Sequence, residues 1–290
     1  MGVTIFSPAK INLFLAVTGR REDGYHDLVS VAVPLDFGDI LTVEAESGFS
    51  LECADAEVPR DESNLVLKAA RAYAVATGWT GGAKFSLEKR IPMGAGLGGG
   101  SSNAVAALRA LDRLAGGLLG EARMAEVATA LGSDCALFLK NAPVVMRGRG
   151  ERTETMPEAA IARLRGRRVL LFKPSFGIST LWAYGRMIAR GTDYLPAAEV
   201  ERWLAAWTES GAPAEDLLLN NMESATQEKF VALPVLLDKI RREFGVAARM
   251  SGSGSACFAL LREDAVTAAM TGCIRECWGP GAFVQEARIA

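Results

Sequence analysis

The 290-residue chain lacks an apolar run long enough to cross a membrane, and it lacks an excess of basic charge. A membrane-spanning helix needs roughly 18 unbroken apolar residues, and no stretch approaches that length. The net charge is −2, whereas nucleic-acid binders are typically basic. The N-terminal residues have neither the basic nor the apolar region of a secretory signal. These absences predict a cytoplasmic protein that has neither a membrane nor a nucleic acid as its partner.

Metal-binding and disulfide-forming residues are also scarce. The five cysteines include no C-x-x-C pair, and His26 is the only histidine. Zinc sites and redox pairs need such clusters, so neither is indicated. We therefore expect buried, reduced thiols at all five positions, which are Cys53, Cys135, Cys257, Cys273 and Cys277.

Half of the residues are apolar and 23% are charged, which is enough apolar material for a sizeable core. The first forty residues alternate as β structure, whereas residues 64–77, 102–114 and 121–131 show helical periodicity. Strands and helices mix without strict β-α-β alternation, which predicts an α+β fold. We expect two domains, 1–154 and 155–290, with a boundary in the Gly- and Glu-rich region after Arg147.

A glycine-rich segment opens the helix predicted from residue 102. Five glycines allow several backbone N–H groups to point into one concavity, and the following helix adds partial positive charge. We expect the two serines to cap the helix and to donate hydroxyls to phosphate or to a metal-bound water. The predicted nucleotide-binding loop comprises Pro92, Met93, Gly94, Ala95, Gly96, Leu97, Gly98, Gly99, Gly100, Ser101 and Ser102, and is followed by Asn103.

Other interpretations of this segment fit less well. A flexible turn capped by serine is the simplest alternative. Gly94, Gly96 and Gly99 also match the dinucleotide pattern G-x-G-x-x-G, but Pro92 intervenes where a buried strand is required. The Walker pattern needs a lysine directly after the glycines, and none is there. A nucleotide phosphate loop of a third kind remains.

The loop sequence P-M-G-A-G-L-G-G-G-S-S-N resembles the phosphate loop of the GHMP kinases. The N-terminal S-P-A-K-I-N-L-F-L and the C-terminal M-S-G-S-G-S resemble the first and third motifs of that family. The resemblance implies a two-domain kinase that uses ATP, and Mg²⁺ follows from the chemistry of ATP. The implied domains are an N-terminal one like the second domain of ribosomal protein S5 and a ferredoxin-like C-terminal one.

A second signature narrows the resemblance. Residues 19–26 read G-R-R-E-D-G-Y-H, which is similar to family members that phosphorylate the 2-hydroxyl of a cytidine-diphosphate-linked methylerythritol in non-mevalonate isoprenoid synthesis. The segment P-S-F-G-I-S-T at 174–180 also resembles them. We expect a small soluble substrate and a monomer or weak homodimer. There are two alternatives. One is a kinase for homoserine, mevalonate or a sugar, and the other is a nucleotide-binding regulator without catalysis.

The resemblance implies roles for two ionisable residues. Asp134 matches the catalytic carboxylate, which accepts or orients the proton of the acceptor hydroxyl; the alternative is a helix cap. Lys10 lies on the polar face of its strand, where it would stabilise transferred-phosphoryl charge near Asp134; the alternative is a solvated edge-strand lysine. The proline expected after Asp134 is replaced by Ala136, and the usual N-D-x-E block reads N-N-M-E, with Asn221 in place of aspartate.

Substrate-binding roles are also implied by the resemblance. Asn12 would touch substrate or phosphate, while Tyr25 and His26 would recognise cytosine with Tyr184 on its opposite face. Core packing is the alternative for His26 and Tyr184. Asn64 and Lys89 match positions that contact adenine. The alternatives are a helix cap for Asn64 and a solvated strand charge for Lys89. The segment 251–255 would serve the phosphate side or only connect strands, and the one tentative Mg²⁺ ligand is Ser102.

Overall fold

The structure, a computed structural model, describes residues 2–290, which fall into two compact units that alternate along the chain. The first unit contains residues 2–9, Phe37–Met93 and Gly98–Asn141, and the second contains Lys10–Asp36, Gly94–Leu97 and Ala142–Ala290. Strands β1 (Val3–Arg20) and β2 (His26–Glu46) contribute residues to both units. The α+β class is confirmed, whereas the boundary expected near residue 155 stays a prediction.

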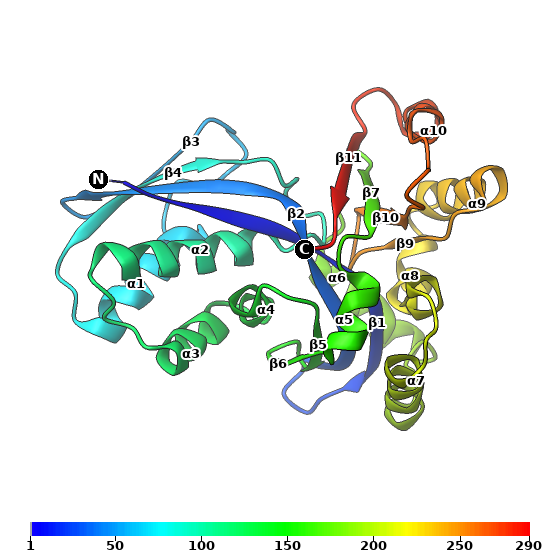
Figure 1. Cartoon of the computed structure of the whole chain (residues 1–290), viewed down its shortest axis with the longest axis horizontal. Coiled ribbons are helices and arrows are strands. Elements are labelled where there is room, and N and C mark those ends of the chain that lie inside the picture. Colours follow the sequence, from blue (N-terminus) through cyan, green and yellow to red (C-terminus); the bar gives the residue numbers. More distant parts are fainter. Residues whose placement is uncertain (1) are drawn as a thin grey trace. The chain divides into compact units, whose positions relative to one another are not determined.

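The first unit packs helices on one face of a sheet. Strand β4 (Gly82–Glu88) pairs antiparallel with β2 and parallel with β3 (Phe49–Cys53). Alternate residues of these strands, such as Val43 and Phe85, are fully buried, as a half-buried sheet requires. The helices are α1 (Leu65–Thr77), α2 (Gly99–Leu114), α3 (Glu121–Leu131) and α4 (Cys135–Lys140). Figure 1 shows two of the helices, α1 and α2, along that face and the other two, α3 and α4, beyond them.

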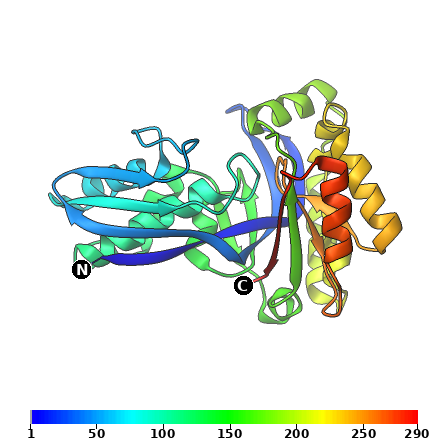
Figure 2. The ribbon, with the colours of Figure 1, turned by 90° about the horizontal axis from the view of Figure 1, so that it is seen from above.

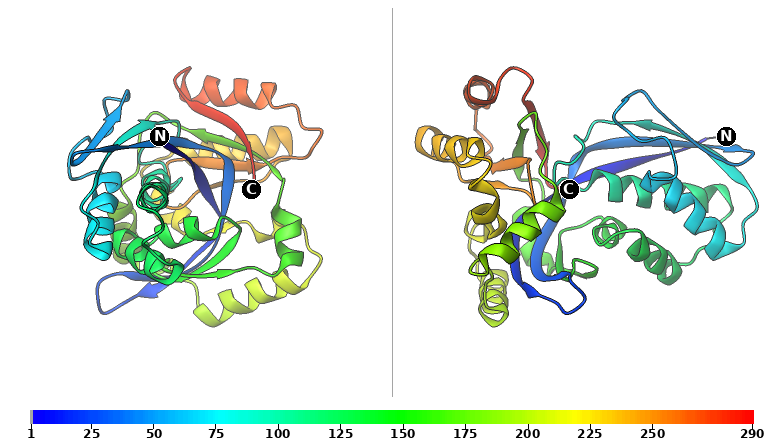
Figure 3. Two further views of the ribbon diagram at one scale, coloured as in Figure 1. Left: turned by 60° about the vertical axis from the view of Figure 1, so that its left-hand side comes forward. Right: turned by 180° about the vertical axis from the view of Figure 1, so that it is seen from behind.

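Helix α2 is the central helix of this unit. Every residue from Ser102 to Leu108 is buried, and a helix that is buried all round must be enclosed by other elements. It contacts α1, α3 and α4, whose grouping around it is visible in Figure 3. Three alanines in this stretch allow the neighbouring backbones to approach closely. The first turn of α2 is therefore held by packing and has little freedom to move.

The second unit contains a four-stranded antiparallel sheet in the order β11-β7-β10-β9. Its strands are β7 (Arg168–Lys173), β9 (Ala248–Met250), β10 (Cys257–Leu260) and β11 (Phe283–Arg288). The inner strands β7 and β10 are apolar and buried on both faces. Figure 2 shows α8 (Met222–Gln227), α9 (Ala232–Phe244) and α10 (Ala268–Trp278) on one face of this sheet.

The remaining elements of the second unit pack around β1 and β2. Strand β5 (Val144–Gly148) pairs antiparallel with β2 and with β6 (Arg152–Thr155), and β8 (Leu219–Asn220) pairs parallel with β1. The other helices are α5 (Glu158–Leu164), α6 (Thr180–Arg190), α7 (Ala197–Glu209) and the short 3₁₀ helix η1 (Ala214–Leu217).

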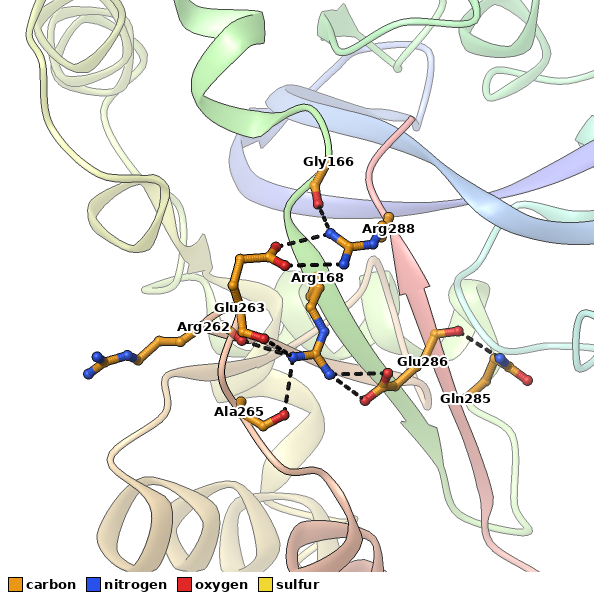
Figure 4. Close-up of polar contacts among 8 residues, drawn as sticks. All are labelled: Gly166, Arg168, Arg262, Glu263, Ala265, Gln285, Glu286 and Arg288. Atoms are coloured by element: carbon orange, nitrogen blue, oxygen red, sulfur yellow. Dashed lines mark hydrogen bonds and ion pairs between the residues drawn. The ribbon is translucent and has the colours of Figure 1, made fainter.

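An arginine cluster ties the ends of β7 and β11 to a neighbouring loop (Figure 4). The Arg168 guanidinium donates to the carbonyl oxygens of Arg262, Glu263 and Ala265 at 3.1, 2.7 and 3.1 Å, and to the Glu286 carboxylate at 2.9 Å. Arg288 donates to the Gly166 carbonyl at 2.7 Å and pairs with Glu263. Arg168 thus satisfies backbone groups that regular structure leaves unpaired.

All five cysteines are free, and four of them are buried. The exception is Cys277, which lies exposed on α10. The five thiols are free, as expected. The expected burial of all five is wrong, because Cys277 lies on the side of α10 that faces away from the core. Within residues 2–290, none of the helices has the length and apolar character to cross a membrane.

Candidate active site

Helix α2 begins inside the glycine-rich segment, three residues earlier than the sequence predicts. Gly98, with φ 72°, takes the N-cap position, and no side chain caps the helix. Capping by Ser101 and Ser102 is therefore wrong, because both serines lie within the helix. The first N–H groups of an α-helix have no partner within it, and such a start favours an anion such as phosphate.

Asp134 stands at the start of α4, in the same unit. Its half-buried side chain makes no capping hydrogen bond to that helix, which disfavours the helix-cap interpretation. The segment lies beside the phosphate loop, because a Cβ built on Gly132 would sit 3.7 Å from Ser101 Oγ. Burial raises the pKa of the adjacent Cys135 thiol to about 11, so that thiol stays protonated at neutral pH. The carboxylate predicted to be catalytic and the phosphate loop are thus neighbours.

The two residues predicted to contact adenine have other partners in the structure. Asn64 is the N-cap of α1, where its Oδ1 accepts from Val66 N at 2.9 Å and its Nδ2 donates to the Pro59 carbonyl at 2.7 Å. Lys89 is not a solvated strand charge, because its ammonium lies 2.6 Å from the fully buried Asp39 carboxylate. Contact of either residue with adenine stays a prediction.

The three sequence motifs meet around residues 94–97 in the second unit. Lys10 N donates to the Leu97 carbonyl at 2.9 Å, and Ala256 N donates to the Ala95 carbonyl at 3.0 Å. Ser251 Oγ donates to the Gly96 carbonyl at 3.1 Å. The first and third motifs, which are more than a hundred residues apart in the sequence, thus both bind the middle of the loop. The segment 251–255 is more than a strand connection.

Lys10 and Asn12 form the polar face of β1 in this unit. Lys10 is 4% exposed and donates to Asn12 Oδ1 at 2.6 Å, so the solvated edge-strand interpretation is wrong. The reason is that β1 is an interior strand, lying between β2 and β8. Asn12 also donates from Nδ2 to Ser30 Oγ at 2.8 Å and from its backbone N to Ser251 Oγ at 3.3 Å. A buried amide and ammonium are therefore fixed beside the motif cluster.

The signature G-R-R-E-D-G-Y-H forms the hairpin that connects β1 to β2. Arg21 N donates to the Tyr25 carbonyl at 2.8 Å, and Tyr25 N donates to Asp23 Oδ1 at 3.1 Å. Gly24 supplies the positive φ of 85° that the turn needs. The Tyr25 ring is 55% exposed, and the Arg149 guanidinium lies 4.5 Å from its centroid. An exposed, positioned aromatic ring is suited to stacking on a base.

His26 lies next in the chain, against two further tyrosines. Its ring stacks on Tyr184 with centroids 4.5 Å apart, and Nε2 lies 3.1 Å from the Tyr194 hydroxyl. Burial, and then the positive charge of Arg20, lower the pKa of His26 below its ordinary 6.5. The structure thus brings His26 and Tyr184 together, and contact of either residue with cytosine stays a prediction. The sequence indicated nothing about Tyr194.

Sequence reasoning also assigned no role to the residues of the N-N-M-E block. Asn220 Nδ2 donates to the carbonyls of Met250 and Gly252 at 2.8 and 2.9 Å, and Glu223 Oε1 accepts from Met250 N at 2.7 Å. Asn221 accepts from Val17 N at 2.8 Å and donates to the Val17 carbonyl at 2.9 Å. The departure to asparagine fits its surroundings, because aspartate cannot donate the second bond. Asn220 and Glu223 thus hold the backbone of the third motif, whereas Asn221 is bound to β1.

No group of three or more His, Cys, Asp or Glu side chains suited to a metal ion occurs in residues 2–290. The tentative Mg²⁺ ligand Ser102 is 1% exposed, and its Oγ accepts from Ser7 Oγ at 2.8 Å. Hydroxyl and carboxylate oxygens are the donors that Mg²⁺ takes, usually alongside nucleotide phosphates. Ser101, Ser102 and Asp134 therefore fit in kind, and contact of Ser102 with a metal stays a prediction.

Comparison with known proteins agrees with this geometry. The family model "GHMP kinases N terminal domain" matches residues 64–142, and "GHMP kinases C terminal" matches residues 206–275. A protein of Chloroherpeton thalassium named 4-diphosphocytidyl-2-C-methyl-D-erythritol kinase is 36% identical over 91% of both chains. A protein of the same name from Granulibacter bethesdensis is 37% identical over 96% of this chain and 94% of its own.

Solved structures extend the likeness to the fold. A crystal structure of 4-(cytidine 5'-diphospho)-2C-methyl-D-erythritol kinase matches with a TM-score of 0.78 and 33% identity, over 99% of this chain and all of the other. Homoserine kinase from Cytophaga hutchinsonii, at 16% identity and a TM-score of 0.72, covers 99% of this chain and 95% of its own and shares the fold alone. The chain therefore belongs to the GHMP kinase family, and its relatives there are the 4-diphosphocytidyl-2-C-methyl-D-erythritol kinases.

Proposed function

We propose that this protein transfers the γ-phosphate of ATP to the 2-hydroxyl of 4-diphosphocytidyl-2-C-methyl-D-erythritol, a step in non-mevalonate isoprenoid precursor synthesis. The observation that carries the proposal is the meeting of all three motif segments around residues 94–97, in a chain that is 36% identical to a kinase of that name. We expect the reaction to take place in the cytoplasm, and we expect the protein to be a monomer or a weak homodimer.

Nucleotide binding is assigned to the start of α2. The N–H groups behind Gly98 and the hydroxyl of Ser101 suit the phosphate oxygens of ATP, which a helix N-terminus attracts. Bound Mg²⁺, held by the phosphates with Ser102 as its proposed protein ligand, would neutralise phosphate charge. Asn64 and Lys89 remain the proposed adenine contacts. The loop thereby fixes the γ-phosphate for direct transfer, which depends mainly on positioning and charge stabilisation.

Proton transfer is assigned to Asp134. The 2-hydroxyl oxygen attacks the γ-phosphorus, the bond to the bridging oxygen breaks, ADP leaves, and the hydroxyl proton passes to the Asp134 carboxylate. General-base assistance of this kind contributes about 10²–10⁴-fold in rate. The ammonium of Lys10, oriented by Asn12 at 2.6 Å, is proposed to stabilise charge on the transferred group. No covalent phospho-enzyme is required.

Acceptor recognition is assigned to the signature hairpin and its neighbours. Tyr25 offers an exposed ring for stacking on cytosine, and Tyr184 is proposed for the opposite face. His26, whose pKa is lowered, is neutral at pH 7 and presents one N–H donor and one acceptor nitrogen. Because Nε2 lies 3.1 Å from the Tyr194 hydroxyl, Nδ1 is the nitrogen proposed to hydrogen-bond to the cytosine edge.

The test is ADP release with Mg-ATP and the cytidyl substrate, with homoserine, mevalonate and galactose as parallel acceptors. Turnover confined to the cytidyl substrate, and reduced at least about 10²-fold in Asp134→Asn, supports the proposal. The matched control is Asp55→Asn, which changes an exposed carboxylate that accepts only a turn hydrogen bond from Glu57 N. Turnover with another acceptor contradicts the substrate assignment, and ATP binding without any turnover contradicts the enzyme assignment.

A further inference from the structure

A fully buried carboxylate lies behind the phosphate loop in the first unit. Asp39, on β2, is 0% exposed. Its Oδ1 accepts from Arg90 N at 2.7 Å and from Ile91 N at 2.8 Å, and its Oδ2 accepts from Lys89 Nζ at 2.6 Å and from Asn103 Nδ2 at 2.9 Å. A buried charge is tolerated only with such complete pairing.

These four donors bracket the glycine-rich loop. Lys89, Arg90 and Ile91 immediately precede the loop, and Asn103 lies in the first turns of α2, directly after it. Asn103 Nδ2 also donates to Ser7 Oγ at 2.8 Å, and the Ser7 hydroxyl donates to Ser102 Oγ. One carboxylate thus joins both ends of the loop, and β1 is tied into the same network.

The ammonium of Lys89 is held against the helix start. A Cβ on Gly99 would lie 3.0 Å from Lys89 Nζ, so the cation sits beside the first residue of α2. A cation is unfavourable near the positive end of a helix, and the adjacent Asp39 carboxylate offsets that cost. The helix start itself favours an anionic ligand, which an arriving phosphate satisfies, while Lys89 stays paired with Asp39 beside it.

We propose that Asp39 is a positioning residue for the nucleotide. Its carboxylate fixes the two ends of the loop in their phosphate-binding arrangement, and it holds the Lys89 ammonium in place for contact with the nucleotide, before the nucleotide binds. This inference rests on the proposed function, because it takes ATP as the ligand of the loop. Preorganisation of this kind strengthens binding by removing the ordering cost that a mobile loop would incur.

The substitution that tests this is Asp39→Asn. Asparagine keeps the size and one acceptor oxygen, but it removes the charge that holds Lys89 and turns an NH₂ group towards a donor. Hydrogen bonds to charged groups are worth about 1.5–3 kcal/mol, which corresponds to roughly 10–100-fold in affinity. We expect the dissociation constant for Mg-adenylyl imidodiphosphate, measured by calorimetry, to rise at least about tenfold. Binding of cytidine 5'-diphosphate should change less than about twofold.

Further variants separate positioning from folding. Asp36→Asn is the matched control, because Asp36 is an exposed carboxylate of the same strand that accepts from Arg288 N at 2.6 Å. The double variant Asp39→Asn with Lys89→Met removes both buried charges. If Asp39→Asn alone does not fold, nucleotide binding is measured on this double variant instead. Positioning predicts that the double variant recovers thermal stability, but that it binds the nucleotide less tightly than Lys89→Met alone does.

Each outcome has a distinct meaning. Nucleotide affinity that is unchanged in Asp39→Asn, or no weaker in the double variant than in Lys89→Met alone, overturns the inference. Equal losses of nucleotide and cytidine 5'-diphosphate binding would also overturn it, because they would show general unfolding. Wild-type protein that binds cytidine 5'-diphosphate but no adenine nucleotide would instead contradict the proposed function.

Discussion

Gly96 and Ser251 approach so closely that any side chain at position 96 would place its Cβ 2.3 Å from the Ser251 carbonyl oxygen. Gly96 also has a φ of 77°, in a region that favours glycine. The contact joins the phosphate loop to the third motif, and it leaves no room for even one methyl group.

The first prediction concerns this contact. Gly96→Ala should raise the dissociation constant for Mg-adenylyl imidodiphosphate at least about tenfold, because Ser251 or the loop must move. The matched control is Gly94→Ala, which shares a positive φ of 58° but meets nothing within 4 Å. Left-handed backbone costs a non-glycine residue roughly 1–2 kcal/mol at either position. Equal effects in the two variants would show that backbone strain, and not the close contact, is responsible.

The single histidine gives a direct pH prediction. Because the pKa of His26 is lowered by burial and by Arg20, its ring signals in NMR should titrate with a midpoint below 6.5. Folding then gains stability from His26 above pH 6.5, and loses that contribution as the pH falls through the lowered value. Affinity for cytidine 5'-diphosphate should be flat from pH 7 to 8.

Arg20→Gln should move the His26 midpoint upwards, since a positive neighbour disfavours the protonated ring. Arg21→Gln serves as the control, because the Arg21 guanidinium is paired with Asp23 and Asp27. A midpoint unmoved by Arg20→Gln would contradict the assigned cause.

A third prediction concerns Tyr25 and Arg149. The guanidinium 4.5 Å from the ring centroid should hold the exposed ring in place. Such contacts are worth about 0.5–1 kcal/mol at exposed sites, so Arg149→Gln should weaken cytidine 5'-diphosphate binding about two- to fivefold. Arg152→Gln, in the β5–β6 hairpin that also carries Arg149, should leave cytidine 5'-diphosphate binding unchanged. Tighter binding in Arg149→Gln would show that the arginine occupies the face that the base needs.

The arginine cluster of Figure 4 gives a stability prediction. Arg168→Gln should lower the free energy of unfolding by about 2 kcal/mol or more, because three loop carbonyls and the Glu286 carboxylate lose one charged donor that is itself only 15% exposed. Glu263→Gln should cost much less than Arg168→Gln, since the Glu263 side chain is 70% exposed and its pair with Arg288 is screened by solvent. Chemical denaturation measures both, and similar losses would contradict the special role of Arg168.

Helices with strong periodicity were predictable from the sequence, and helix starts within glycine runs were not. The helix 121–131 is confirmed at both ends, because apolar spacing and flanking glycines mark it. Helix α2 begins before its predicted start, since packing against α1, α3 and α4 overrides the low helix propensity of glycine.

Site residues that lie in recognisable motifs could be predicted from the sequence, whereas isolated site residues could not. Lys10, Asn12 and Ser251 stand in recognisable segments, and the structure brings those segments together. Asp39 and Tyr194 act through contacts with distant parts of the chain, so no local pattern marks them. Asn220 lies in the N-N-M-E block, but its contacts with Met250 and Gly252 could not be foreseen from that block. An isolated aspartate in an apolar strand is visible in the sequence, but its partners are known only once the fold is known.

The exposure of Cys277 alone among the five thiols makes the native chain a ready substrate for site-specific labelling. A maleimide fluorophore should attach at that position of α10 without any engineered cysteine. Cys135, beside the proposed catalytic carboxylate, is protected by burial and by its raised pKa. Ligand binding can therefore be followed by fluorescence anisotropy or by surface immobilisation on the wild-type sequence, with the proposed reacting groups left unmodified.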